Sequence, residues 1–306
     1  MRNAFADEIT ARAKADERIV LLSGDIGNRL FDKFKEACPT RFYNCGVAEA
    51  NMVGMAAGLA MCGLRPVCYT IAPFLTYRCM EQIRVDLCYH HVPVVLVGTG
   101  SGLAYASLGA THHSCEEVGM LRLLPGLNVM APGDAWEVRG CLSAALADEN
   151  PTYIRIGKKG EPLVHGSRPE IRLGQALQLS EGREVALLSS GAMLPEVVAL
   201  GKLLESQGMR PAVYSLPTVK PLDTALLEKV FADFRVIATV EEHSVLGGLG
   251  GSIAEWKADR PKMPGRLLRF GTEDVFLHET CEQEEAREHF GLTSQKMAER
   301  IAAALR

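Results

Sequence analysis

Short apolar runs alternate with helical patterns along the 306 residues, and this alternation constrains the fold more than any other feature. Most of the runs are too apolar for a strand with one wet face, which is typical of parallel strands covered by helices on both sides. Strands that alternate with helices predict a doubly wound α/β fold. The expected strands are 19–23, 41–45, 65–71, 93–99, 127–132, 151–156, 184–190, 210–215, 235–241 and 267–270.

A polar stretch in the middle of the chain divides it into two such units. The sequence GKKGEPLVHGSRPEIRL at 157–173 is rich in Gly and Pro, as linkers are. We expect a first domain at 1–160, a linker at 161–173 and a smaller second α/β domain at 174–306. Asp134 follows Pro-Gly and precedes an apolar-periodic run, so it is an expected helix N-cap. The expected helices of the first domain are 3–18, 47–62, 75–90, 114–124 and 134–147.

Composition excludes several classes of function. Charged residues make up 23% of the chain and the formal net charge is −4, with no basic face of the kind that binds nucleic acid. The opening residues lack the apolar core of a signal peptide, and no apolar run approaches membrane-spanning length. The nine cysteines are scattered and form no CxxC pair, so we expect reduced structural thiols in a cytoplasmic protein.

Glu49 is the only charged residue between Arg41 and Arg65, and it begins a run of Ala, Gly, Met and Val that hydropathy predicts to be buried. A lone carboxylate in such surroundings is costly unless a partner meets it. The dipole at the start of a helix also favours a carboxylate. This position alone therefore leaves a purely structural role open.

Five blocks of sequence, taken together and in order, resemble the transketolase family. Four resemble its pyrimidine-binding domain and the last resembles its C-terminal domain, so the resemblance covers nearly the whole chain. It implies a thiamin-binding fold with a mostly parallel sheet, followed by a smaller α/β domain. The blocks are GVAEANMVGMAAGLAMCGLRP (46–66), APFLTYRCMEQIR (72–84), GATHH (109–113), LPGLNVMAPGDAWEV (124–138) and EEHSVLGGLGGSIAEW (241–256).

The resemblance implies thiamine diphosphate as cofactor and a second polypeptide as partner. The family binds this cofactor between two domains, one of which holds the diphosphate through Mg²⁺ with a GDG motif and a later Asn. The nearest match here, SGDIGN at 23–28, lacks the second Gly and lies on the first strand. The chain therefore resembles the C-terminal subunit of a split transketolase, with Mg²⁺ held by the N-terminal, diphosphate-binding subunit.

The same resemblance indicates how the subunits assemble. A helix face of small residues within 46–62 is expected to be buried in an interface. Two copies of this subunit, paired with each other, and two of the missing one would form a closed heterotetramer.

The resemblance also assigns cofactor contacts. Glu49 matches the carboxyl that hydrogen-bonds the aminopyrimidine and helps the thiazolium carbon to lose its proton, so it is both catalytic and cofactor-binding. Phe74 and Tyr77 are the two candidates for the ring that stacks on the aminopyrimidine, with core packing as the alternative for either. Asp25 and Arg78 are expected near the cofactor, although a solvated helix face is the alternative for Arg78. Without cofactor, we expect the Glu49 carboxyl to be unsatisfied or met only by water.

Substrate contacts are expected from a loop and a strand end. His112 matches the histidine of the family's G-x-T-H pattern and would move protons on the ketose as a catalytic group, with His113 beside it as a further contact. Arg155 matches an arginine that holds the sugar phosphate, and Arg29 is a further candidate for an anion contact. For Arg155, an ion pair with a carboxylate is the alternative.

Two departures from the family pattern affect the substrate side. Ser107 and Leu108 stand where the family carries Glu-Asp, and Gly98 stands near the place of a usual histidine. The ordinary sugar-phosphate specificity is therefore in doubt. The sequence still indicates transfer of a two-carbon ketol unit from an anionic ketose to an aldehyde. The alternatives are an acyloin synthase acting on pyruvate, the beta subunit of a 2-oxoacid dehydrogenase, and a non-catalytic interaction protein that retains the fold.

Overall fold

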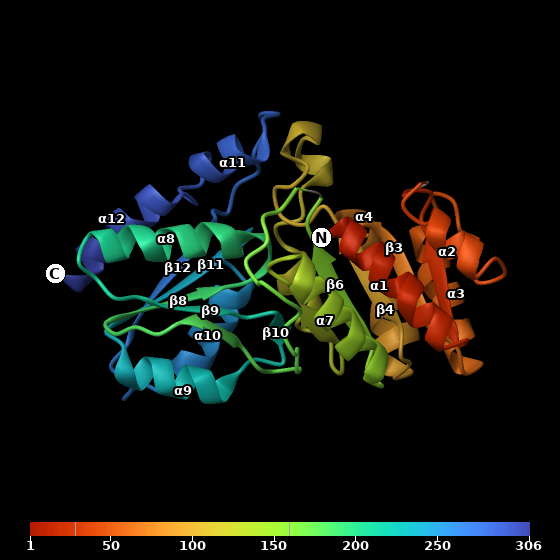
Figure 1. Ribbon diagram of the computed structural model, residues 1–306, viewed down its shortest axis with the longest axis horizontal. Coiled ribbons are helices and arrows are strands. Elements are labelled where there is room, and N and C mark those ends of the chain that lie inside the picture. Colours follow the sequence, from red (N-terminus) through yellow and green to blue (C-terminus); the bar gives the residue numbers. More distant parts are fainter. Residues whose placement is uncertain (28, 159) are drawn as a thin grey trace.

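The computed structural model describes residues 1–27, 29–158 and 160–306, and these form two α/β domains that lie side by side (Figure 1). Each domain has one mostly parallel sheet with helices on both of its faces, which confirms the predicted fold class. Residue 28, in the SGDIGN segment, and residue 159, in the polar stretch 157–173, lie outside the described residues.

The first domain is built on a seven-stranded sheet with the order β10-β5-β6-β4-β3-β1-β2. Neighbouring strands run parallel except β10 and β5, which are antiparallel. Its strands are β1 (Ile19–Ser23), β2 (Phe42–Asn44), β3 (Arg65–Ile71), β4 (Val95–Thr99), β5 (Asn128–Met130), β6 (Thr152–Ile156) and β10 (Thr218–Lys220).

Helices cover both faces of this sheet. α1, α2 and α7 pack on one face, and α3, the π-helix η1 and α6 pack on the other. The helical elements are α1 (Arg2–Ala15), α2 (Asp32–Ala37), α3 (Glu49–Met61), α4 (Ala72–Thr76), α5 (Met80–Gln82), η1 (Ile83–Tyr89), the 3₁₀ turns η2 (Ala106–Leu108) and η3 (Ala110–His112), α6 (Glu117–Leu121) and α7 (Ala135–Ala147).

The second domain has a five-stranded sheet with the order β12-β11-β8-β9-β7, in which only β7 is antiparallel to its neighbour. α8 and α12 lie on one side of this sheet, and α9 and α10 lie on the other (Figure 1). The elements are β7 (Leu177–Ser180), β8 (Val185–Ser189), the 3₁₀ turn η4 (Gly191–Met193), α8 (Leu194–Ser206), β9 (Ala212–Ser215), α9 (Thr224–Asp233), β11 (Val236–Ser244), α10 (Leu249–Ala258), β12 (Arg266–Thr272), α11 (Gln283–His289) and α12 (Ser294–Leu305).

The expected strands and the expected helix at 75–90 differ from the structure in two places. All ten expected strands are present, but the short strands β7 and β10 were missed, because three or four residues at a sheet edge carry little periodic signal. The single helix expected at 75–90 is wrong, since the chain forms α4, α5 and η1 there. Cys79, between α4 and α5, has non-helical φ and ψ of −108° and 11°, which interrupts the helix.

The domains share structure across the linker. β10 comes from the second half of the chain yet pairs with β5 in the first sheet. The linker follows β6 and is held to the start of α7, where Asp134 caps the helix as predicted through hydrogen bonds of 2.9 Å from the Trp136 and Glu137 N–H groups. The other carboxylate oxygen of Asp134 accepts hydrogen bonds from the N–H groups of Val164 and His165. One carboxylate therefore fixes both the helix start and the linker.

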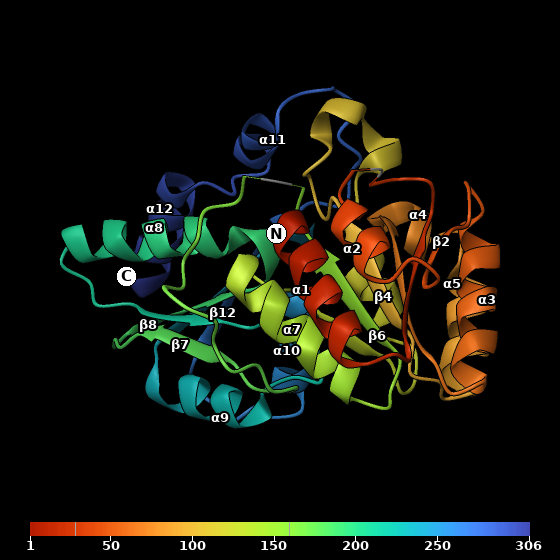
Figure 2. The same ribbon diagram turned by 45° about the vertical axis from the view of Figure 1, so that its right-hand side comes forward.

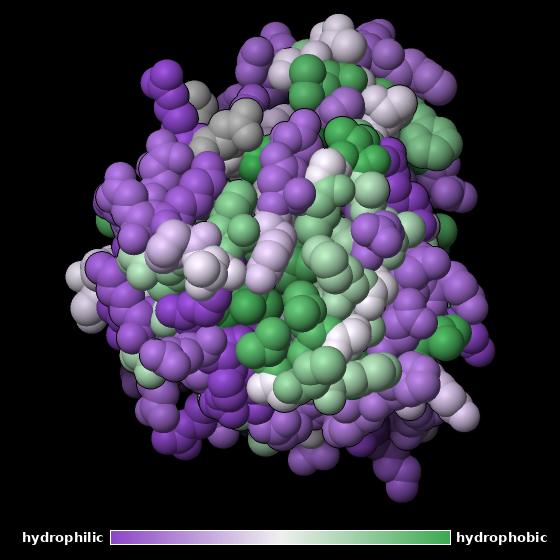
Figure 3. Space-filling view, turned by 90° about the vertical axis from the view of Figure 1, so that its right-hand side faces the viewer, coloured by the Kyte–Doolittle hydropathy of each residue, from purple (hydrophilic) through white to green (hydrophobic). Residues whose placement is uncertain are grey.

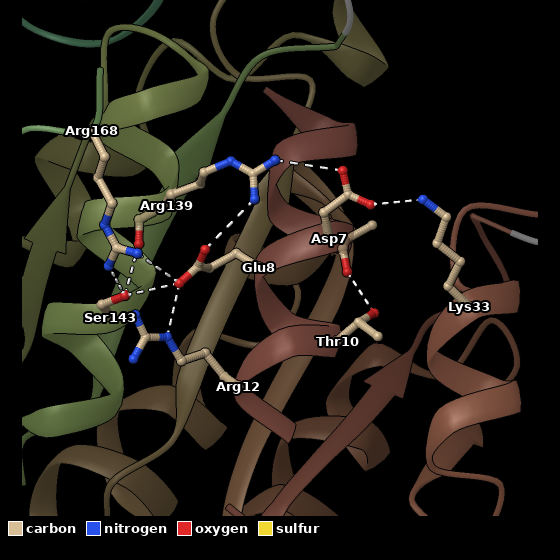
Figure 4. A network of polar contacts seen from close by, with 9 residues as sticks. Asp7, Glu8, Thr10, Arg12, Lys33, Arg139, Ser143 and Arg168 are labelled. Carbon is tan, nitrogen blue, oxygen red and sulfur yellow. Dashed lines mark hydrogen bonds and ion pairs between the residues drawn. The ribbon is translucent and has the colours of Figure 1, made fainter. Parts of the chain in front are cut away.

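A polar network around the buried Glu8 joins α1, α7 and the linker (Figure 4). Glu8 Oε1 accepts hydrogen bonds from Arg12 Nε at 2.8 Å, Arg168 Nη1 at 3.0 Å and Ser143 Oγ at 3.2 Å. Arg139 Nη1 lies 3.6 Å from Oε2. Burial by itself raises the pKa of Glu8, but the hydrogen bond from Arg12 and the charges of Arg168 and Arg12 more than offset it, so that the net pKa is lowered.

Two general features are plain from the described residues. The nine cysteines are all free thiols, as expected. No helix of the described ranges is long and apolar enough to cross a membrane.

Candidate active site

The carboxyl ends of β1, β3, β4 and β6 meet at one edge of the first sheet, because these strands are parallel neighbours. The segments that follow them converge there, and α/β sheets bind ligands at this edge. Glu49 begins α3, Phe74 lies in α4 directly after β3, and His112 lies in the loop after β4. The topology therefore brings together residues that are far apart in sequence.

Glu49 is the first residue of α3 and is 2% exposed. Gly24, directly after β1, lies close to it. A Cβ at Gly24 would come within 2.8 Å of Thr70 Oγ1 and 3.6 Å of the Glu49 Cγ, so glycine is required for this close packing. The Thr70 hydroxyl is buried and has no hydrogen-bond partner among the described residues.

The Glu49 carboxyl is not unsatisfied, so that expectation is wrong. Arg78 Nη1 donates a hydrogen bond of 3.0 Å to Glu49 Oε2. The physical reason is the cost of an unpaired buried carboxylate, which an arginine at the interrupted helix removes. The second oxygen, Oε1, accepts no hydrogen bond from the described part of the chain, and the Arg78 side chain is itself 47% exposed.

Phe74 and His112 extend this pair into a cluster. The Arg78 guanidinium lies 4.4 Å from the centre of the Phe74 ring. His112 meets the same ring edge-on at 5.1 Å, and Tyr105 lies 6.2 Å from the imidazole on another side. The His112 Nδ1 lies 3.0 Å from the Thr111 hydroxyl. Four of the predicted residues, Glu49, Arg78, Phe74 and His112, thus form one group.

Tyr77 faces a different group. Its hydroxyl donates a hydrogen bond of 2.5 Å to Glu116 Oε2. Burial, followed by the charges of Glu117 and Glu116, raises the pKa of Tyr77, so the phenol stays a proton donor at neutral pH. Of the two rings considered for stacking, Phe74 is the one that lies beside the Glu49 and Arg78 pair.

The two adjacent histidines point to different places. His113 is buried, and its Nε2 has no hydrogen-bond partner among the described residues. It lines a cavity of about 60 Å³ between the two domains together with Tyr77, Glu116 and Leu277. Burial lowers the pKa of His113, which keeps the imidazole neutral at pH 7. The structure therefore separates His113 from the group that contains His112.

Arg155 is 3% exposed and lies in the interior. Its Nε is 2.8 Å from Glu117 Oε1, and its Nη2 donates hydrogen bonds to the carbonyl oxygens of Ser114 and Glu242 at 3.0 and 3.2 Å. Burial raises the pKa of Glu117, and the Arg155 charge opposes that rise. This is the ion-pair alternative, and an anion contact would need these partners to be displaced.

Asp25 and Arg29 lie outside the Glu49 group. Asp25 has a positive φ of 58° and its Oδ1 accepts a hydrogen bond of 2.8 Å from Asn44. Arg29 is exposed and lines a separate pocket between α1 and α2 with Asn3 and Asp32. Their predicted contacts with cofactor and anion stay predictions.

The residues present fit one half of thiamine diphosphate. Glu49 Oε1 is open to accept a hydrogen bond from an aminopyrimidine, the Phe74 ring offers an aromatic surface, and the Thr70 hydroxyl is an unpaired polar atom close to Glu49. Among the described residues, no group of three His, Cys, Asp or Glu side chains is placed to hold a metal ion.

Sequence reasoning missed several polar residues near the site. Glu116 binds the Tyr77 hydroxyl, and Tyr105 contacts His112. The buried Glu242 contacts the loop that carries the histidines. Only Glu242 had a usable signal, since adjacent carboxylates at the end of an apolar strand are unusual.

Comparison with known proteins finds a separate family match for each of the two domains. The family described as transketolase, pyrimidine binding domain, matches residues 1–161, and transketolase, C-terminal domain, matches residues 174–297. An apulose-4-phosphate transketolase subunit from Phocaeicola vulgatus is 32% identical over 96% of this chain and 94% of its own length. A 6-deoxy-6-sulfo-D-fructose transketolase subunit from Clostridium sp. is 33% identical over 97% of this chain and 92% of its own length.

A solved structure extends this similarity to the whole fold. A split gene transketolase, an inactive beta4 tetramer, superimposes with a TM-score of 0.90 at 32% identity. The match covers 99% of this chain and 97% of that one.

Proposed function

The chain belongs to the transketolase family, and on this basis we propose that it is the pyrimidine-binding subunit of a split, thiamine diphosphate-dependent transketolase. Its reaction is transfer of a two-carbon ketol unit from a ketose to an aldehyde. Relatives of similar length are, by their names, subunits of transketolases, which supports the division of the site between two chains.

One observation carries the proposal. The Glu49 carboxyl is buried, keeps one oxygen open, and lies in a group with Phe74 and His112 at the carboxyl edge of the sheet. A stability role alone would call for a carboxylate with both oxygens satisfied. A ligand that offers a hydrogen bond and a flat ring would use the open oxygen and the aromatic surface together.

Each residue has a distinct part in this function. When bound, thiamine diphosphate supplies an electron sink for the transferred carbon unit. Glu49 holds or shares a proton at the ring nitrogen, a role that suits a carboxyl in a dry site. Phe74 packs against the flat ring and restricts its orientation. His112, half-buried beside them, moves protons to and from substrate oxygens near neutral pH.

The donor is proposed to be an anionic ketose. The two named relatives act, by their names, on apulose 4-phosphate and 6-deoxy-6-sulfo-D-fructose, which carry a phosphate and a sulfonate. Ser107 and Leu108 lie on the turn η2 close to His112, and Leu108 is 52% exposed. An apolar side chain at this place favours a donor with fewer hydroxyl groups to recognise there.

The partner is proposed to be a diphosphate-binding subunit that covers the side of the molecule near α3. Figure 3 shows a hydrophobic area on that side. Val47 is 74% and Met61 is 56% exposed, and a cavity of about 400 Å³ nearby is lined by Val85, Cys88 and Tyr89. Exposed apolar area of this kind marks an interface. A heterotetramer of two copies of each subunit is the proposed assembly.

The decisive experiment is reconstitution with a diphosphate-binding subunit that carries the GDG motif and the later Asn. The mixture, with thiamine diphosphate and Mg²⁺, is offered ketose phosphates, a sulfonated ketose and pyruvate, with aldehyde acceptors. Ketol transfer from an anionic ketose supports the proposal. Carbon dioxide release from pyruvate without ketol transfer replaces it with an acyloin synthase or 2-oxoacid dehydrogenase, and a complex inactive on every donor supports the interaction protein.

A further inference from the structure

The loop at residues 101–115, here called the histidine loop, is closed at its base. Gly102 and Ser114 exchange two backbone hydrogen bonds of 3.0 Å. His112 lies beyond this closure, in the turn η3. Whatever holds the base therefore sets where the imidazole lies relative to Phe74.

Glu242, in β11 of the second domain, is buried against this base. Its Oε2 accepts a hydrogen bond of 3.1 Å from the Leu103 N–H. A Cβ at Gly102, where φ is +61°, would lie 2.6 Å from the Cβ of Glu242, so the loop backbone packs directly on this side chain. Arg155 Nη2 also donates hydrogen bonds to the carbonyl oxygens of both Glu242 and Ser114, which links the backbone of β11 to the loop base.

The same carboxylate is also bound by two side chains of α11. Gln283 Nε2 donates hydrogen bonds to its two oxygens at 2.9 and 3.1 Å, and Arg287 forms an ion pair with Oε1. A small apolar cluster joins the same elements, with Leu103, Ala106 and Cys115 of the histidine loop packed on Leu277 and Ala286. Figure 1 and Figure 2 both show α11 beside this loop, above the junction of the domains.

We propose that Glu242 is a positioning residue, which fixes the histidine loop to α11 so that the second domain sets the placement of His112 against Phe74. A buried carboxylate with several charged and neutral donors has a single low-energy orientation. The hydrogen bond from the Leu103 N–H then fixes the base of the histidine loop relative to this carboxylate. The value of this placement for catalysis rests on the proposed function, whereas the attachment of the loop does not.

Glu241 provides a matched control. It precedes Glu242 in the same buried strand, and successive side chains of a strand point to opposite faces. Its two oxygens accept hydrogen bonds from the Leu249 and Gly250 N–H groups at 2.8 and 2.7 Å, at the start of α10. A Glu241→Gln change therefore perturbs a buried carboxylate of the same strand without touching the histidine loop.

The first test measures amide hydrogen exchange in the subunit alone. Glu242→Gln and Arg287→Gln should each speed exchange of the 101–115 peptide by about tenfold, because the base can then open locally. Arg287 is the safer site, since its side chain is partly exposed. Glu241→Gln should speed exchange at the start of α10 and leave the loop unchanged. Unchanged loop exchange in both Glu242→Gln and Arg287→Gln overturns the proposal.

The second test separates positioning from cofactor binding in the reconstituted complex. Glu242→Gln should lower kcat about tenfold, because the chemical step is slower when a catalytic group is displaced from its place beside the substrate. The Kd for thiamine diphosphate should stay the same, because Glu49 and Phe74 are untouched. The proposal is overturned if kcat is unchanged although loop exchange is faster. It is also overturned if the affinity for thiamine diphosphate falls by as large a factor as kcat does. If a Glu49→Gln complex keeps full turnover, the proposed function fails, while loop exchange still reports whether Glu242 holds the loop.

Discussion

Arg78 donates a hydrogen bond of 3.0 Å to the buried carboxylate of Glu49 across 29 positions of sequence. The two residues differ sharply in environment, since the carboxyl is buried and the guanidinium is half-exposed. An exposed side chain on a buried acid can move away at little cost, whereas the acid cannot. The pair therefore satisfies one carboxylate oxygen in the subunit alone and leaves Oε1 free to meet another hydrogen-bond partner.

Replacing the acid should stop the reaction. We expect Glu49→Gln to lower kcat of the reconstituted enzyme by about 100-fold or more, the range for loss of a general acid or base. Steady-state ketol transfer is the measurement. Glu81→Gln, an exposed carboxyl on α5, is the control and should retain normal turnover. Equal activity of Glu49→Gln and the control would disprove the assigned role.

Removing Arg78 should cost stability only when Glu49 is present. Arg78→Met leaves a buried carboxylate without its donor, so we expect a loss of about 1 kcal/mol at pH 7, reduced by the exposure of Arg78. In a Glu49→Gln background the loss should nearly vanish. Urea unfolding of the four proteins in this cycle gives the coupling. A loss of the same size in both backgrounds would show that Arg78 acts through its contact with Phe74 instead.

Phe74 and Tyr77 should differ in their effect on cofactor affinity. Phe74→Leu removes the ring beside Glu49, and we expect the Kd for thiamine diphosphate to rise about fivefold, the order of a lost stacking contact. Tyr77→Phe removes only the hydroxyl that binds Glu116, so the Kd should stay constant. Isothermal titration of the reconstituted complex decides this. If Tyr77→Leu weakens binding and Phe74→Leu does not, Tyr77 is the stacking ring.

Replacing Arg155 should lower the free energy of unfolding of the subunit, whatever its effect on substrate binding. Because its guanidinium is buried on Glu117, Arg155→Met should destabilise the subunit alone by about 3 kcal/mol, the effect of leaving one buried charge unpaired. Arg155→Met with Glu117→Leu should recover most of that loss. Denaturant unfolding checks both. Normal stability combined with a raised KM for an anionic donor would restore the predicted anion contact.

The Glu8 network should give the subunit a stability that depends on acid pH. Glu8→Gln should cost about 2 kcal/mol at pH 7, because Arg12 and Arg168 lose a buried partner. The pKa of Glu8 is lowered from 4.5, so its stabilisation is complete above that pH and is lost as the pH falls through the folded value. Unfolding at pH 7 and below 4.5 should show the difference from wild type shrink. A constant difference would mean that the Glu8 charge is not involved.

The sequence by itself determined the elements and the chemical inventory. Apolar runs marked ten of the twelve strands found in the described residues, Asp134 marked the start of α7, and Glu49 was conspicuous because its segment has no other charge. These signals are local, since a strand period, a cap and a burial pattern each depend on a few neighbouring residues.

Only the tertiary structure decided which of these residues meet. It placed Arg78 on Glu49, turned His112 and His113 to different sides, and buried Arg155 on Glu117. It also joined Glu242 to the histidine loop across 139 positions. Such contacts depend on how sheets and domains pack, and a buried charge takes whichever distant partner the packing brings within hydrogen-bonding distance. No local pattern encodes that choice.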